Sequence, residues 1–152
     1  MNSSSIILLA HNIRSLWNVG SFFRTADAMQ VEKIYLTGYT AVPPRREISK
    51  TAIGAEEWIP WEYQKDPMAV ITQLKAVGYG IVGLELADNA VPIMDYSAEG
   101  NICLVVGHEV TGVPTEILEA CNSTVYIPMH GKKESLNVSV ALGIALHSLR
   151  NS

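Results

Sequence analysis

The sequence has few of the features typical of secreted or membrane proteins. It contains two cysteines, Cys103 and Cys121, in 152 residues, and they do not form a Cys-x-x-Cys motif. The apolar run near its start, Ile6–Leu9, is too short for a membrane span or for the core of a signal peptide. We therefore expect reduced structural thiols, no membrane segment and a cytoplasmic location.

A surplus of positive charge is also missing. The chain has 11 lysines and arginines against 15 aspartates and glutamates, a formal net charge of −4. Because domains that bind nucleic acid unaided are usually basic, the overall charge argues mildly against such a partner. A local basic face is still compatible with the sequence, since many cations fall in or beside predicted loops: Arg14, Arg24, Arg45, Arg46, Lys50, Lys132 and Lys133.

Two glycine motifs lack the context that nucleotide binding requires. Residues 78–83 fit G-x-G-x-x-G, but a predicted helix precedes them and a strand follows, the reverse of a dinucleotide-binding turn. Residues 107–112 have P-loop glycine spacing without the following lysine and hydroxyl residue. The four histidines have no spacing suited to zinc, so we predict solvated or hydrogen-bonded roles and no metal: His11, His108, His130 and His147.

The sequence does contain a regular alternation of short apolar runs and longer segments of helical spacing. The runs lie at 6–9, 34–36, 81–84, 102–106 and 124–127, and the helical segments at 19–30, 66–77, 114–121 and 136–149. This alternation predicts an α/β fold with a mostly parallel sheet and helices on both faces. A hydrophobic content of 48% is enough for the core of one domain over residues 1–152.

The last predicted helix is apolar around most of its circumference. Such a helix must be buried on two sides, which favours the sheet on one side and a second subunit on the other. We therefore predict a homodimer. The alternative is a central helix within the core of one subunit.

Three segments carry a family resemblance. The first is His11–Arg14 with Asn18–Ala28, the second is Leu104–Val113, and the third and most specific is Ile127–Ala141. Together they resemble the signatures of the SpoU/TrmH family of SPOUT methyltransferases. Lys50–Ala55 is also similar to a family segment, so the likeness extends from about residue 8 to 149.

The resemblance implies a fold, a cofactor and a reaction. It implies a C-terminal trefoil knot, threaded by residues 123 to the final helix. Unlike many relatives, this chain is expected to form a single domain without a separate RNA-binding domain. It implies an enzyme that uses S-adenosyl-L-methionine to methylate a ribose 2′-hydroxyl of RNA. We favour tRNA over rRNA as the substrate, because a small enzyme can address an exposed loop with splayed nucleotides.

The resemblance also assigns site residues. It implies five residues at the catalytic centre: Asn18, Arg24, Glu109, Ser135 and Asn137. It implies cofactor contacts by Gly107, Ile127 and Leu136, with Leu84 and Met129 as further candidates. From the residues alone, core packing is the favoured role of Leu84, Ile127 and Leu136, and Gly107 is equally compatible with a turn.

The catalytic assignments have structural alternatives. Arg24 could act as a general base, but lowering its pKa to near neutrality would cost roughly 7 kcal/mol, so we favour a bidentate grip on the substrate phosphate. A salt bridge from Arg24 to Asp27 is the structural alternative. Glu109 could cap backbone N–H groups before Pro114, and Ser135 and Asn137 could cap the last helix.

Three other functions compete with this interpretation. Ribosomal RNA could be the substrate in place of tRNA. A knotted enzyme could methylate a base, although the pair of Asn18 and Arg24 disfavours it. The chain could also be a non-catalytic RNA-binding or assembly module of the same fold, an alternative that the net negative charge supports.

Overall fold

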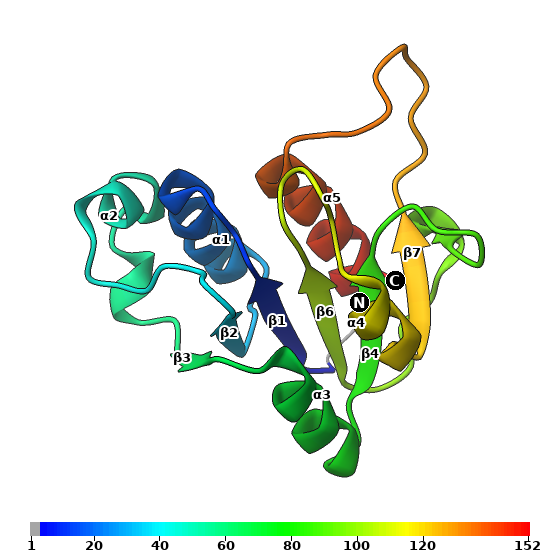
Figure 1. Cartoon of the computed structure of the whole chain (residues 1–152), viewed down its shortest axis with the longest axis horizontal. Helices are drawn as coiled ribbons and strands as arrows, with labels where there is room; N and C mark the ends of the chain where they lie inside the picture. The colour runs from blue at the N-terminus through cyan, green and yellow to red at the C-terminus, as the bar shows by residue number, and fades with distance from the viewer. Residues whose placement is uncertain (1–3) are drawn as a thin grey trace.

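A single parallel sheet organises the molecule. The computed structural model describes residues 4–152, and its seven strands follow the order β3-β2-β1-β6-β4-β7-β5 (Figure 1). Every neighbouring pair is parallel, which confirms the predicted α/β class. The strands are β1 (Ile6–His11), β2 (Lys33–Thr37), β3 (Trp61–Gln64), β4 (Gly80–Leu84), β5 (Val91–Pro92), β6 (Ile102–Val106) and β7 (Ser123–Tyr126).

Helices cover both faces of the sheet, as predicted. The helices are α1 (Leu16–Ala28), α2 (Arg46–Ala52), α3 (Pro67–Ala76), α4 (Thr115–Ala120) and α5 (Val138–Arg150), with two 3-10 turns, η1 (Ala55–Glu57) and η2 (Ile93–Asp95). Alternate side chains of a strand enter opposite cores. In β1, Ile6 and Leu8 pack with α1, α2 and α5, whereas Ile7 and Leu9 pack with α3 and α4.

Local sequence signals account for the helix ends. Helix α1 begins before the predicted residue 19 because the Ser15 hydroxyl accepts a hydrogen bond from the Asn18 backbone N–H, at 3.2 Å. Asp66 caps α3, and Gly78 follows that helix with a φ of +95°. Because Gly80 then starts β4, residues 78–83 connect a helix to a strand and do not form a dinucleotide-binding turn, as predicted.

Tertiary contacts create elements that the periodicity did not predict, namely α2, β3 and β5. Helix α2 packs closely on α1, and Gly20 makes this approach possible. A Cβ at Gly20 would collide with the Thr51 hydroxyl and the Ile48 carbonyl oxygen. The glycine therefore brings a short charged helix against α1 where the sequence around Arg46 has no strong helical signal.

The strand order places segments that are distant in sequence side by side. Strand β6 lies between β1 and β4, and β7 lies between β4 and β5. The chain therefore twice inserts a later strand between two earlier ones. This order is compatible with the trefoil knot, which stays a prediction. Cys103 is buried, Cys121 is half-buried, and both are free thiols as expected. No helix within residues 4–152 is long and apolar enough to cross a bilayer.

Candidate active site

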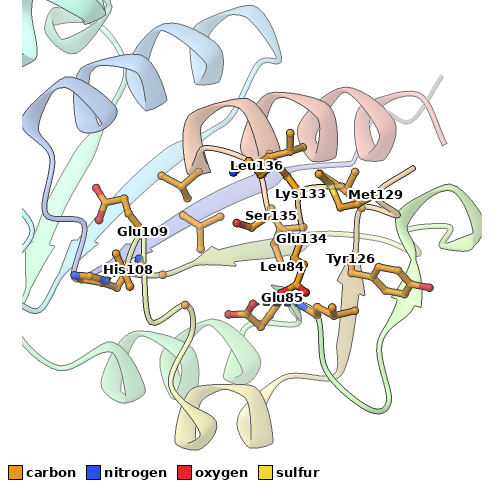
Figure 2. A pocket seen from close by; sticks show the side chains of 18 of the residues that line it. Leu84, Glu85, His108, Glu109, Tyr126, Met129, Lys133, Glu134, Ser135 and Leu136 are labelled. Atoms are coloured by element: carbon orange, nitrogen blue, oxygen red, sulfur yellow. Dashed lines mark hydrogen bonds between the residues drawn. The ribbon is translucent and has the colours of Figure 1, made fainter. Parts of the chain in front are cut away.

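A cavity of about 700 Å³ opens at the carboxyl ends of β4, β6 and β7 (Figure 2). Three segments enclose it: the start of the loop after β4, the loop 107–112 after β6, and much of the stretch 127–136 before α5. Open α/β sheets bind ligands at this edge. All five residues predicted to contact a cofactor line the cavity: Leu84, Gly107, Ile127, Met129 and Leu136.

The loop after β6 is a tight turn built around two glycines. A Cβ at Gly107 would lie 2.5 Å from the Gly112 carbonyl oxygen, so no other residue fits without moving the loop. The Gly112 N–H donates to the His108 carbonyl at 2.9 Å, and His108 Nδ1 accepts from the N–H groups of Val110 and Thr111. Gly107 thus has both the predicted turn role and a place in the cavity wall.

Glu85 is a cavity residue that the sequence reasoning missed. Its Oε2 accepts a hydrogen bond from the Val113 N–H at 2.8 Å, which ties the end of β4 to the glycine loop. Gly112 has a φ of +74°, and a Cβ there would collide with the Glu85 carboxylate. The available signal was its position, because Glu85 directly follows a strand end where ligands bind.

Glu109, Asn18 and Ser139 form a hydrogen-bonded network beside the cavity. Glu109 accepts from the backbone N–H groups of Arg14 and Ser15, at 2.9 and 2.8 Å, and from Asn18 Nδ2 at 3.0 Å. The Ser139 hydroxyl donates to Asn18 Oδ1 at 2.7 Å. The first, second and third sequence segments therefore meet at one side chain, that of Asn18.

The hydrogen bonds of Glu109 differ from the capping role predicted for it as an alternative to catalysis. Glu109 does accept from backbone N–H groups, but they belong to Arg14 and Ser15, directly before α1, and not to the segment before Pro114. Burial alone would raise the pKa of Glu109, yet the hydrogen bonds from Arg14, Ser15 and Asn18 outweigh it and hold the pKa below its usual value. The carboxylate is thus charged at neutral pH.

The remaining predicted catalytic residues lie in different surroundings. Ser135 is exposed and lines the cavity. The Asn137 side chain caps α5 by accepting from the Ser139 N–H at 2.8 Å, as its structural alternative predicted, and it does not line the cavity. Arg24 is exposed on α1 and lies outside the cavity lining.

The salt bridge proposed as an alternative for Arg24 does not form. Asp27 Oδ1 instead accepts a hydrogen bond from Trp58 Nε1 at 2.8 Å. Within residues 4–152, the only ion pair is that between Lys33 and Glu62. The Arg24 guanidinium is therefore not paired with an acidic side chain in the part of the chain that the structure describes.

The family model described as SpoU rRNA Methylase family matches residues 5–147. The chain belongs to this family. It is 32% identical to the 23S rRNA (guanosine-2′-O-)-methyltransferase of Acinetobacter baylyi, over 96% of this chain and 59% of that one. It is 34% identical to the tRNA (guanosine(18)-2′-O)-methyltransferase of Aquifex aeolicus, over 93% of this chain and 67% of that one.

A solved structure of an rRNA methyltransferase has the same fold. The AdoMet-bound rRNA methyltransferase from Sinorhizobium meliloti superposes with a TM-score of 0.91 at 28% identity, covering 97% of this chain and 56% of that chain. This chain thus spans little more than half of that protein and 59% of the Acinetobacter relative. The span matched to the SpoU family includes the whole cavity and the Asn18 network.

Proposed function

We propose that this chain binds S-adenosyl-L-methionine in the cavity and methylates a ribose 2′-hydroxyl of RNA. The observation that carries the proposal is a cavity lined by the second and third signature segments, with Asn18 of the first segment hydrogen-bonded to both of them beside it. Names of the relatives support the class of reaction, since both curated proteins above are RNA guanosine 2′-O-methyltransferases. The RNA substrate suggests that the enzyme works in the cytoplasm.

The residues of the cavity suit an adenosyl cofactor. A volume of about 700 Å³ is in the range typical of sites for small ligands. Leu84, Ile127 and Leu136 supply apolar walls for the faces of an adenine ring. Residues 128–136 belong to no helix or strand, so their backbone groups are available to the polar edge of the ring. When bound, the cofactor supplies an electrophilic methyl group.

The chain's own residues then have to orient the ribose and let its proton leave. Asn18 is fixed at both ends of its amide, by Glu109 and by Ser139, which suits a side chain that positions a substrate hydroxyl. The Arg24 guanidinium grips the neighbouring phosphate, which stabilises negative charge on the ribose oxygen as the hydroxyl proton passes to phosphate or water.

A homodimer would bring Arg24 into use. Leu142, Ala145 and Leu146 of α5 are buried against the sheet, whereas Val140 and Ile144 are 51% and 43% exposed on its outer side. Covering that apolar stripe with a second copy is the arrangement that the sequence predicts. Arg24 does not line the cavity of its own chain. In a dimer formed through α1 and α5, Arg24 would instead contact the substrate bound at the partner's cavity.

Calorimetry with S-adenosylmethionine tests the first half of the proposal. We expect wild-type protein to bind it, and Gly107→Ala to lose binding because the added Cβ displaces the glycine loop. Gly80→Ala is the matched control, since Gly80 lies at the far end of β4 and its Cβ would have ordinary contacts at 3.9 Å. A wild-type protein without affinity for the cofactor would support a non-catalytic module instead.

Transfer of a radioactive methyl group to RNA tests the second half. Unmodified tRNA and rRNA serve as parallel substrates, with tRNA as the expected acceptor. Alkaline hydrolysis of the product distinguishes the acceptor atom, because a 2′-O-methyl group protects the adjacent phosphodiester. Label that appears only on bases would contradict ribose methylation, and label on rRNA alone would contradict the choice of tRNA.

A further inference from the structure

A tryptophan next to Asn18 in the sequence is partly exposed and lies near two cationic side chains. Trp17, in the first turn of α1, is 48% exposed. The Lys50 ammonium lies 5.8 Å from the centroid of its ring. A hollow of about 330 Å³ is lined by Trp17, Arg46, Glu47 and Lys50. Tryptophan side chains are usually well buried because they have a large apolar surface. An indole that is half exposed beside a cation is therefore a candidate for ligand binding.

We propose that Trp17, Arg46 and Lys50 form a platform that binds an unpaired nucleotide of the RNA strand flanking the methylated ribose. The indole stacks on the base, and the two cations contact phosphates. The proposal rests on the proposed function, because it takes the RNA substrate as the occupant. We refer to these three residues as the Trp17 platform.

The platform is held rigidly. The Thr51 hydroxyl donates to the Trp17 carbonyl at 2.7 Å, and the glycine at position 20 brings α2 into close contact with α1. This contact of α2 with α1 (Figure 1) fixes Lys50 beside the indole, and Arg46 lies about one helical turn before Lys50 on α2. A preorganised surface loses little freedom when a ligand binds, which favours a binding role.

Charge favours a nucleic acid over a protein as the occupant. The chain as a whole carries −4, but Arg45, Arg46 and Lys50 are exposed in this region and Glu47 is the one carboxylate lining the hollow. Single-stranded nucleic acid is recognised by aromatic rings for its bases and cations for its backbone. A protein interface would instead need a continuous apolar centre.

The position of the platform suits a strand that also reaches the catalytic centre. Trp17 directly precedes Asn18. Arg24 lies seven residues after Trp17, which is two helical turns or about 10.5 Å further along the same side of α1. In the proposed dimer Arg24 acts at the partner's cavity, so a strand lying along this side of α1 would contact Trp17 with one nucleotide and place another beside Arg24 at that cavity.

Fluorescence anisotropy with a labelled single-stranded RNA dodecamer tests the platform. Trp17→Ala should weaken binding by roughly 5- to 100-fold, the effect of losing one stacked base, and Trp17→Phe should restore most of it. Lys50→Gln should lower the slope of log affinity against log salt by about 0.7, since one phosphate contact is lost. Trp17→Ala should leave that slope unchanged.

Two controls match these variants. Trp58 is 58% exposed, but its ring N–H donates to the Asp27 carboxylate. The negative charge of Asp27 disfavours binding of an anionic strand at this ring. Lys75 lies on α3, on the opposite face of the sheet. Trp58→Ala and Lys75→Gln should both bind the dodecamer like wild type. Equal losses in the Trp17 and Trp58 variants would overturn the proposal.

Failure of the platform is distinguishable from failure of the proposed function. If wild type methylates RNA and Trp17→Ala binds the dodecamer with unchanged affinity, the platform is refuted and the function stands. If wild type binds the dodecamer through Trp17 but transfers no methyl group, the platform stands and the activity is refuted. Light scattering completes the test, because a Trp17→Ala protein that changes its oligomeric state would assign Trp17 to a protein interface.

Discussion

Replacing Glu109 with glutamine should destabilise the protein although the two side chains have the same shape. The carboxylate accepts three hydrogen bonds at 2.8 to 3.0 Å, two of them from the backbone N–H groups of Arg14 and Ser15 directly before α1. A glutamine retains one oxygen. If that oxygen takes the place of Oε2, the amide NH₂ faces the Arg14 N–H, and two donors then oppose each other.

The expected loss follows from these contacts. A net hydrogen bond to a charged group contributes about 1.5 to 3 kcal/mol, and a negative charge at a helix N-terminus about 0.3 to 1 kcal/mol. Because Glu109 is only partly buried, we take the lower part of each range and expect Glu109→Gln to lower the free energy of unfolding by about 2 kcal/mol. For a chain of this size that corresponds to roughly 4 to 8 °C in melting temperature.

The pH dependence identifies the charge as the cause. The pKa of Glu109 is lower in the folded state than the value of about 4.3 in an unfolded chain, so its stabilisation is complete above that value and is lost as the pH falls through the folded pKa. Urea unfolding should show a constant difference between wild type and Glu109→Gln at pH 6 to 8, shrinking below about pH 4. Glu119→Gln, on the exposed side of α4, is the control. Equal stability at pH 7, or a difference that persists at low pH, would refute the argument.

Three further substitutions test the site and the dimer. Arg24→Lys should reduce methyl transfer by about 100-fold or more at unchanged cofactor affinity, because lysine lacks the planar two-point grip; wild-type turnover would make Arg24 structural. Leu136→Glu should weaken cofactor binding, measured by calorimetry, and should not unfold the protein, since Leu136 is 37% exposed. Equal affinity of variant and wild type would show that Leu136 does not contact the cofactor. Ile144→Glu should yield monomers in light scattering and Val77→Glu should not, whereas a wild-type monomer would refute the interface.

The sequence was sufficient for those parts of the fold that local interactions determine. Strands β1 and β6 are continuous apolar runs, and α3 has a capping aspartate, a proline in its first turn and a glycine after its end. Helix α2 and strand β3 could not be predicted in this way. Helix α2 depends on its contact with Gly20, and β3 is an edge strand whose Trp61–Gln64 segment is only partly buried.

The site also has a part that the sequence could predict and a part that only the folded chain reveals. All predicted cofactor residues line one cavity because they follow the carboxyl ends of parallel strands or precede the last helix, positions that sequence order and a family resemblance can identify. The bond between Ser139 and Asn18 joins residues 121 positions apart, and only the folded chain brings them together. For the same reason the sequence suggested the wrong helix for Glu109 to cap.

The Asn18 network also explains why an amide occupies that position. Its nitrogen donates to the Glu109 carboxylate while its oxygen accepts from the Ser139 hydroxyl, so the side chain has to donate and accept at once. An aspartate at position 18 would place a second carboxylate against Glu109. A leucine there would leave the Ser139 hydroxyl and one oxygen of Glu109 without this partner in a partly buried setting. Glu109 belongs to the glycine loop of the cavity and Ser139 to the first turn of α5. A shift in either wall of the cavity therefore moves the same amide.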